Sequence, residues 1–243
     1  MKNDTNIAKE WHGHALKIKQ DANKIILGQE KAINLVIISL FARGHVLLEG
    51  GVGVGKTTLL QVITKLIGGS YERVEGTVDL MPNDIIYHAS ISDEGRPSIS
   101  KGPLLKKGED LSVFFFNEIN RARPQVHSLL LRVMAEKSVS AFNKVIYLPN
   151  MVVFADRNQV EKNETFELPA AARDRFMMEV SIQSPTDKVL RDSIIFDTKF
   201  QDTSKLIDDI PSPSFDCKEL NTVSSAIQEN IQTSEHIKNY VET

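Results

Sequence analysis

A glycine-rich segment, GGVGVGKT at residues 50–57, constrains the fold of this chain more than any other feature of the sequence. It follows a short apolar run, residues 45–49, and precedes a segment with helical periodicity, residues 56–66. A strand, a glycine-rich turn and a helix in this order make up the P-loop unit. Because both flanking elements are in place, a chance match is a poor explanation. A dinucleotide-binding turn is also disfavoured, since no acidic ribose contact follows in a suitable second strand.

The P-loop predicts a site for a nucleoside triphosphate and a magnesium ion. Its glycines let successive backbone N–H groups face phosphate oxygens, and the positive end of the next helix faces the same anion. Lys56 would reach the β- and γ-phosphates, and the hydroxyl of Thr57 would bind Mg²⁺. We therefore expect ATP and Mg²⁺ as cofactors. The expected phosphate-binding residues are Gly50, Gly51, Val52, Gly53, Val54, Gly55, Lys56, Thr57 and Thr58.

Apolar runs of strand length alternate with helical segments along the rest of the chain. This alternation predicts an α/β fold, a three-layer core with a mainly parallel sheet. The expected strands are 45–49, 70–76, 111–117, 151–155 and 176–180. The expected helices are 5–23, 33–41, 56–66, 124–136, a helix opened by Ser184-Pro185 and ending near 196, 218–231 and 235–241, with a short one in 169–176.

The chain divides into three expected parts. Residues 1–196 would form the nucleotide-binding core with its N-terminal helix. Residues 197–215 are polar and end with two prolines, which is typical of a linker. Residues 216–243 would form a helical lid that is short and incomplete.

Charge and cysteine content exclude several classes of partner and compartment. The net charge is −3, so the chain lacks the basic field that drives nucleic-acid binding, and we expect no nucleic-acid partner. Its one cysteine, Cys217, allows no intrachain disulfide and favours a reducing compartment. The N-terminus lacks the pattern of a secretory signal, and no apolar run has the length of a membrane span. We therefore expect a cytoplasmic protein with no membrane insertion.

The apolar stretch LSVFFFNE ends in two polar residues, Asn117 and Glu118. Its continuous hydrophobicity predicts a parallel strand that is covered on both faces. A P-loop followed by such a strand, ending in two oxygen-bearing side chains, is the core arrangement of P-loop ATPases.

Seven segments make the resemblance more specific. In chain order they are ILGQE, HVLLEGGVGVGKT, DLMPNDI, KGPLL, FFFNEINRARPQ, LPNMVVFADRN and ELPAAARDRF. Their order and spacing resemble those of the MoxR family of AAA+ ATPases, over about residues 24–183 and more weakly to the end.

The resemblance implies further site residues. Ile26, Leu27 and Gly28 match the segment that surrounds the adenine. Glu118 matches the residue that polarises the attacking water, and Asn158 matches a polar sensor of the γ-phosphate.

Arg175 matches the arginine that is offered to the nucleotide of a neighbouring subunit. A surface ion pair with Asp174 or Glu179 is the alternative for Arg175, and Arg173 competes with it for the same role. For Asn158, the alternative is a turn-forming residue at the end of a strand.

The resemblance also implies partners. An arginine acting in trans implies a homo-oligomeric ring, expected to be a hexamer. Two hairpin insertions, residues 86–100 and 138–148, would engage a client protein. The sequence is similar to MoxR proteins of methanol oxidation systems, which implies methanol dehydrogenase, or a partner with a metal-adhesion domain, as the client. A nucleotide-gated scaffold with little hydrolysis and a chelatase-like motor for metal insertion are the alternatives.

The chain departs from the family pattern at Asn117, where the family has Asp. Asn117 and Thr57 are the expected metal ligands, and a neutral amide holds a cation less strongly than a carboxylate does. We therefore expect reduced magnesium dependence and slow hydrolysis. The sensor segment also differs, since residues 156–159 read Asp-Arg-Asn-Gln where the family has Thr-Gln-Asn-Pro.

Overall fold

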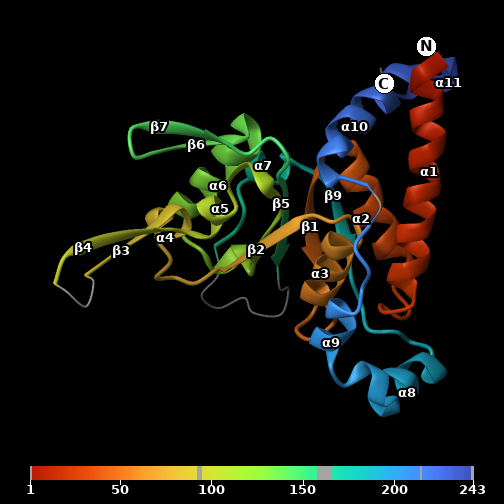
Figure 1. Ribbon diagram of the computed structural model, residues 1–243, viewed down its shortest axis with the longest axis horizontal. Coiled ribbons are helices and arrows are strands. Elements are labelled where there is room, and N and C mark those ends of the chain that lie inside the picture. Colours follow the sequence, from red (N-terminus) through yellow and green to blue (C-terminus); the bar gives the residue numbers. More distant parts are fainter. Residues whose placement is uncertain (1, 92–94, 158–165, 214, 242–243) are drawn as a thin grey trace.

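The computed structural model describes residues 2–91, 95–157, 166–213 and 215–241 (Figure 1). Its helices are α1 (Lys2–Asn23), α2 (Glu30–Ala42), α3 (Lys56–Leu66), α4 (Pro82–Ile86), α5 (Pro103–Lys106), α6 (Pro124–Glu136), α7 (Ala170–Arg173), α8 (Lys188–Phe196), α9 (Thr203–Asp208), α10 (Leu220–Asn230) and α11 (Glu235–Val241). Its strands are β1 (His45–Glu49), β2 (Ser70–Glu75), β3 (Tyr87–Ile91), β4 (Pro97–Lys101), β5 (Leu111–Asn117), β6 (Ser138–Ala141), β7 (Lys144–Tyr147), β8 (Val152–Arg157) and β9 (Phe176–Ser181).

The central sheet is parallel throughout and has the order β2-β5-β8-β1-β9. Strands that are adjacent in space are therefore distant in sequence, and helices on both faces connect them. The expected three-layer α/β fold is confirmed. In this order β8 lies between β5 and β1, so the carboxyl ends of all three strands lie side by side at one edge.

The phenylalanines of β5 show why this strand is buried on both faces. Phe115 packs into the cluster formed with α1, α2 and α3, whereas Phe114 and Phe116 pack into the cluster formed with α4 to α7. All three side chains are fully buried. Removing a side chain of this size from water stabilises the fold by about 2 to 3 kcal/mol.

The N-terminal helix α1 packs against α2, α3 and α10. The Trp11 ring anchors this layer, since it lies 4.7 Å from the ring of Phe215 and 6.0 Å from that of Phe41, in edge-to-face geometry. The segment that follows the core thus returns to cover the first helix (Figure 1).

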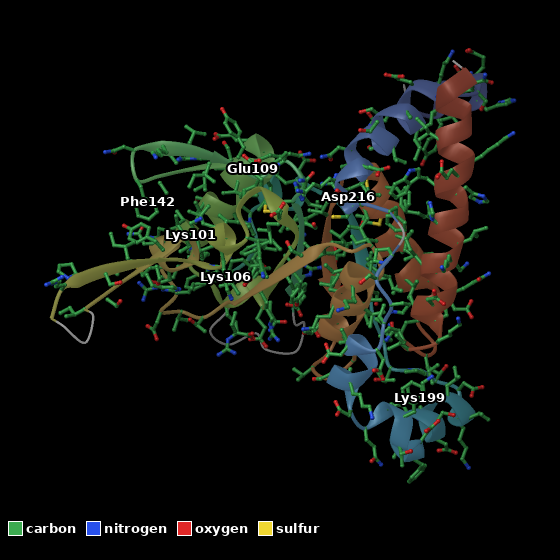
Figure 2. The ribbon with its side chains drawn as sticks, in the orientation of Figure 1. Lys101, Lys106, Glu109, Phe142, Lys199 and Asp216 are labelled. Carbon is green, nitrogen blue, oxygen red and sulfur yellow. The ribbon has the colours of Figure 1, made fainter. Side chains whose placement is uncertain are left out.

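Two antiparallel hairpins, β3–β4 and β6–β7, project from the opposite side of the molecule (Figure 1). They carry exposed apolar side chains, including Ile91, Ile99, Phe142, Val145 and Tyr147. Figure 2 shows Phe142 and Lys101 on this side, and the ring of Phe142 lies 5.3 Å from that of Tyr87, so the two hairpins touch.

The start of α8 differs from the expectation. The helix begins at Lys188 and not at Ser184-Pro185, because the carboxylate of Asp187 accepts a hydrogen bond from the backbone N–H of Leu190, at 3.0 Å, and caps the helix. Pro185 instead packs beside Gly28. The predicted helix start at Ser184-Pro185 was therefore wrong, and Asp187 marks the actual start.

The segment 197–215, expected as a linker, contains the helix α9, which packs against α3. The division of the chain into core, linker and lid stays a prediction. Within the described ranges, no helix has the length and hydrophobicity needed to cross a membrane.

Candidate nucleotide site

The expected phosphate-binding segment lies at the carboxyl edge of the sheet, between the end of β1 and the start of α3. Gly53 and Gly55 adopt positive φ angles of 77° and 90°, a conformation that favours glycine. Gly55 is also the N-cap of α3, and no side chain caps this helix. The first N–H groups of α3 are therefore left for a ligand, which makes its N-terminus a ready anion site.

A cavity of about 290 Å³, which we call the P-loop cavity, lies in front of this turn. Its walls come from the turn, from α3 and from the ends of β2, β5 and β8. The lining residues are Val52, Gly53, Val54, Gly55, Lys56, Thr57, Thr58, Arg73, Asn117, Glu118 and Asp156. The structure thus brings the predicted residues Lys56, Thr57, Asn117 and Glu118 to one cavity, and it adds Arg73 and Asp156.

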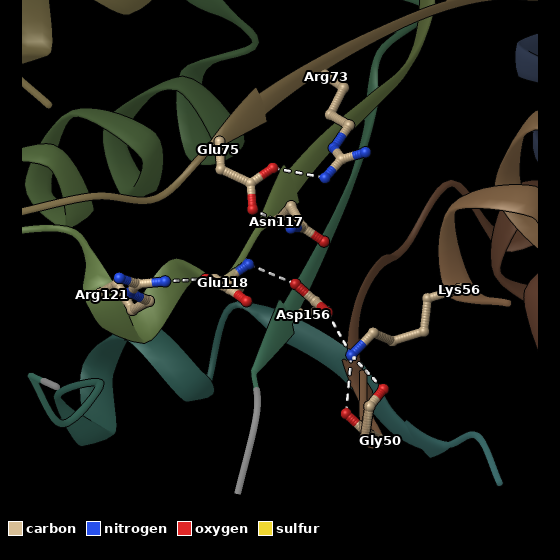
Figure 3. Close-up of polar contacts among 9 residues, drawn as sticks. Gly50, Lys56, Arg73, Glu75, Asn117, Glu118, Arg121 and Asp156 are labelled. Atoms are coloured by element: carbon tan, nitrogen blue, oxygen red, sulfur yellow. Dashed lines mark hydrogen bonds and ion pairs between the residues drawn. The ribbon is translucent and has the colours of Figure 1, made fainter. Parts of the chain in front are cut away.

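The ammonium group of Lys56 is held by three acceptors (Figure 3). It donates to the carbonyl oxygens of Gly50, at 2.7 Å, and Gly51, at 3.3 Å. It also forms an ion pair with Oδ2 of Asp156, at 2.5 Å. The first two contacts are hydrogen bonds and the third is an ion pair.

Asp156 is the residue that sequence reasoning missed. Its side chain is only 1% exposed, and its other oxygen, Oδ1, accepts a short hydrogen bond from the backbone N–H of Glu118. Burial raises the pKa of the Asp156 carboxyl, and the contacts with Lys56 and with the Glu118 N–H oppose that shift. The available signal was a carboxylate that ends the apolar run MVVFAD in a strand next to β5.

The end of β5 carries a second polar network (Figure 3). The side-chain nitrogen of Asn117 donates to Oε1 of Glu75, and Glu75 pairs with Arg73 at 2.5 Å. The amide oxygen of Asn117 points away from Glu75 (Figure 3). Glu75 on β2 thus holds the side-chain nitrogen of Asn117, and the amide oxygen takes no part in this contact.

Glu118 has a left-handed backbone conformation, with φ of 53°, and its side chain lines the P-loop cavity. Its carboxylate is held by Arg121, at 2.8 Å, in the 3-10 turn that follows. A positive φ at a non-glycine residue is uncommon, and such positions cluster at functional sites.

A second cavity, of about 400 Å³, adjoins the first, and we call it the apolar cavity. Ile26 and Leu27 line it, together with apolar side chains of α8 and α9, and it shares Gly53, Val54, Gly55 and Thr58 with the P-loop cavity. Gly28 is adjacent, with φ of 71°, and any Cβ there would lie 2.8 Å from Pro185. A flat apolar group joined to a phosphate chain fits this pair of cavities.

The remaining predicted residues lie elsewhere. Arg175 is exposed between α7 and β9 and lines neither cavity, and in the described part of the chain it forms no ion pair with Asp174 or Glu179. Glu179 instead pairs with Arg157, at 2.6 Å. Arg173 is also exposed. Asn158 lies outside the described residues, and so do residues 92–94 of the turn between β3 and β4.

Comparison with known proteins identifies the family. The sequence profile of the family described as "ATPase family associated with various cellular activities (AAA)" matches residues 45–178. Protein MoxR of Methylorubrum extorquens is 54% identical over 232 residues, which cover 96% of this chain and 68% of that protein. The chain belongs to the MoxR family of AAA+ ATPases. Protein MoxR of Paracoccus denitrificans is 50% identical over 98% of this chain and 70% of its own length.

A more distant relative and a solved structure are also similar to this chain. Chaperone MoxR1 of Mycobacterium tuberculosis is 34% identical over 177 residues, 72% of this chain and 45% of that protein. A crystal structure of a proposed ATPase from Cytophaga hutchinsonii superposes with a TM-score of 0.79 over 99% of this chain and 70% of its own, at 24% identity. That likeness shows the shared fold.

The MoxR family implies a bound nucleotide and Mg²⁺, and the side chains at the site fit both. An uncapped helix N-terminus and the Lys56 ammonium suit phosphate groups. The hydroxyl of Thr57, the free amide oxygen of Asn117 and the carboxylate of Asp156 provide the hard oxygen donors that Mg²⁺ prefers. The family and the donor set therefore agree.

Proposed function

We propose that this MoxR-family chain hydrolyses ATP in the P-loop cavity and uses the cycle, in a chaperone-like role, to activate a partner protein. The observation that carries the proposal is the convergence of Lys56, Thr57 and Glu118 on one cavity beside the uncapped start of α3. The adjoining apolar cavity, lined by Ile26 and Leu27, would receive the adenine.

Each side chain has a role that follows from its place. Lys56 and the N–H groups of Gly53 and Gly55 would bind and orient the phosphates. The Glu118 carboxylate would accept a proton from the attacking water, and it must leave Arg121 to do so. Mg²⁺, when bound with Thr57 and Asn117 as ligands, would neutralise charge on the phosphates.

Turnover is expected to be slow because Asn117 supplies no charge at the end of β5. Its amide is also fixed by Glu75, so the residue cannot swing freely toward a cation. Positioning and charge stabilisation provide most of the catalysis in phosphoryl transfer, and a weaker metal site therefore lowers the rate.

The action on a partner rests on family membership and on the exposed hairpins. The apolar side chains of β3–β4 and β6–β7 would bind the client, for which methanol dehydrogenase, or a partner with a metal-adhesion domain, is the candidate. Arg175, exposed outside both cavities, would complete the site of a neighbouring subunit in a homo-oligomeric ring, proposed to be a hexamer. Asn158 would sense the γ-phosphate.

Phosphate release measured with sedimentation, each with and without ATP and Mg²⁺, tests the proposal. We expect slow release that is lost in Glu118→Gln and an ATP-dependent increase in mass that is retained in that variant. Arg175→Ala should also lose activity while still binding ATP. Phosphate release by Glu118→Gln at the wild-type rate would contradict the assigned role.

A nucleotide-gated scaffold is the second candidate function. The pairs Asn117–Glu75 and Glu118–Arg121 favour it, because both hold catalytic side chains in other contacts. ATP binding that changes the assembly without any release of phosphate would select the scaffold over the ATPase.

A further inference from the structure

Asp156 is a buried negative charge in the cavity that is assigned to the phosphates. Its side chain is 1% exposed, against 18% for Glu118 in the same cavity. Both of its oxygens are engaged, Oδ1 by the Glu118 N–H and Oδ2 by the Lys56 ammonium. A charge this deeply buried needs a counter-charge in every state of the site.

Binding of a triphosphate disturbs that pairing. Lys56 donates two hydrogen bonds to backbone carbonyls, and it is also the ion-pair partner of Asp156. To contact phosphate oxygens, Lys56 must give up at least one acceptor or divide its charge between Asp156 and the phosphates. The triphosphate then places its own negative charge beside a carboxylate that has lost part of its partner.

No other cation in the described part of the P-loop cavity is free to compensate. Arg73 lines the cavity, but it pairs with Glu75 and its guanidinium lies over the ring of Phe115. Arg121 holds Glu118. The compensating charge must therefore arrive with the nucleotide.

We propose that Asp156 makes triphosphate binding depend on a divalent cation, which replaces Lys56 as the counter-charge of this buried carboxylate. Asp156 thereby supplies from β8 the negative charge that Asn117 lacks at the end of β5. The proposal rests on ATP being the ligand of this site. With this role for Asp156, ATP binding depends strongly on Mg²⁺, which is the opposite of the reduced dependence expected from Asn117 alone.

The neighbouring side chains fit this role. Thr57 from α3, Asn117 from β5 and Asp156 from β8 line one cavity, and they offer a cation a hydroxyl, an amide oxygen and a carboxylate. The other carboxylate that lines this cavity, that of Glu118, is paired with Arg121. Glu75, the other carboxylate near Asn117, already accepts from Asn117 and Arg73.

The test compares the affinity for ATP in excess Mg²⁺ with the affinity in EDTA, by isothermal titration calorimetry. For the wild type we expect at least about tenfold tighter binding with Mg²⁺. Asp156→Asn keeps the acceptor for the Glu118 N–H but removes the charge. In this variant the ratio of the ATP affinity in Mg²⁺ to that in EDTA should fall to about threefold or less, chiefly because binding in EDTA becomes stronger.

Two further variants serve as controls. Asp156→Glu keeps the charge and should keep a ratio above about threefold. Glu179→Gln removes one negative charge from β9, outside the cavity, and should keep the wild-type ratio. Thermal unfolding without nucleotide checks that each variant is folded. If Asp156 only anchors Lys56, then Asp156→Asn will change both affinities by the same factor and leave the ratio unchanged, which overturns the proposal.

If Asp156→Asn does not fold, the wild type decides alone, since a Mg²⁺ effect below about twofold on ATP affinity overturns the proposal. A larger effect of Mg²⁺ on the ATP affinity, which Asp156→Glu retains, supports the proposal. Wild-type chain that binds no ATP even with Mg²⁺ refutes the proposed function itself. ATP binding with an unchanged ratio refutes only the role of Asp156.

Discussion

The Asn117→Asp substitution tests whether a missing charge at the end of β5 limits turnover. In the structure, the Asn117 amide donates to Glu75, so an aspartate would bring two carboxylates into contact. Unit charges about 4 Å apart repel by about 4 kcal/mol at an effective dielectric constant of about 20. Because the Glu75 side chain is 46% exposed and pairs with Arg73, we expect a net loss of about 1 kcal/mol in the free energy of unfolding.

The double variant Glu75→Gln/Asn117→Asp removes that repulsion. The glutamine amide can donate to the new carboxylate, which restores the hydrogen bond with donor and acceptor exchanged. We expect the double variant to hydrolyse ATP about tenfold faster than the wild type, which corresponds to about 1.4 kcal/mol in activation free energy. The single Asn117→Asp variant should gain less, because part of its new charge is opposed by Glu75.

Steady-state phosphate release and thermal unfolding of all four proteins give a double-mutant cycle. Glu75→Gln alone is the matched control, because it removes the acceptor without adding a charge at position 117. The reasoning is refuted if the double variant unfolds at the wild-type temperature, binds ATP and still shows no gain in rate. In that case the charge at position 117 does not limit turnover.

Three further predictions concern His45, Glu118 and the core. Burial lowers the pKa of His45 to about 4, whereas the unfolded histidine titrates near 6.5. The stability that depends on neutral His45 is therefore fully present above pH 6.5. It is lost as the pH falls toward 4, and the total loss is about 3 kcal/mol. Denaturant unfolding at pH 7 and pH 5 should show about 2 kcal/mol of this loss, and a His45→Gln variant with the same pH slope as wild type would contradict it. Arg121→Ala frees the Glu118 carboxylate and should raise ATP turnover several-fold at unchanged ATP affinity, measured by phosphate release and calorimetry; a fall in turnover would mean that Arg121 positions Glu118. Phe115→Ala should lower the free energy of unfolding by about 3 to 5 kcal/mol in urea titration, and a loss below about 1 kcal/mol would contradict its place in the core.

Protonation of His45 is costly chiefly because its ring is buried, and the contact with Met134 opposes this effect only in part. Its Nδ1 accepts from the N–H of Val153, at 2.9 Å, and its Nε2 lies 3.3 Å from the carbonyl of Met134 and is the donor there. A proton on Nδ1 would face the Val153 N–H. Arg43 and Lys137 also disfavour the charged form.

Local patterns in the sequence were enough to predict most of the fold. Continuous apolar runs marked β1, β5 and β8, and the glycine-rich turn fixed the start of α3 at Lys56. These features depend on a residue and its near neighbours. The start of α8 was missed because Ser184-Pro185 and Asp187 both have the composition of a helix start, and only the backbone decides between them.

The polar contacts of the site could not be predicted in the same way. The pair Lys56–Asp156 joins residues one hundred positions apart, and it forms because β8 lies between β5 and β1 in the sheet. The contact between Asn117 and Glu75 likewise requires that β2 is the neighbour of β5. Strand order is a tertiary property, so the sequence predicted several residues that line the cavity but missed Arg73 and Asp156, and it predicted none of these pairs.

Hydrogen–deuterium exchange with and without ATP and Mg²⁺ tests the central claim most directly, because it locates the ligand on the chain. If a triphosphate lies against the turn at residues 50–57, amides of this segment and of the first turn of α3 will exchange more slowly when ATP is present. Peptides of β7 should not change. Unaltered exchange across residues 50–58 at saturating ATP, or protection confined to another part of the chain, would contradict the account.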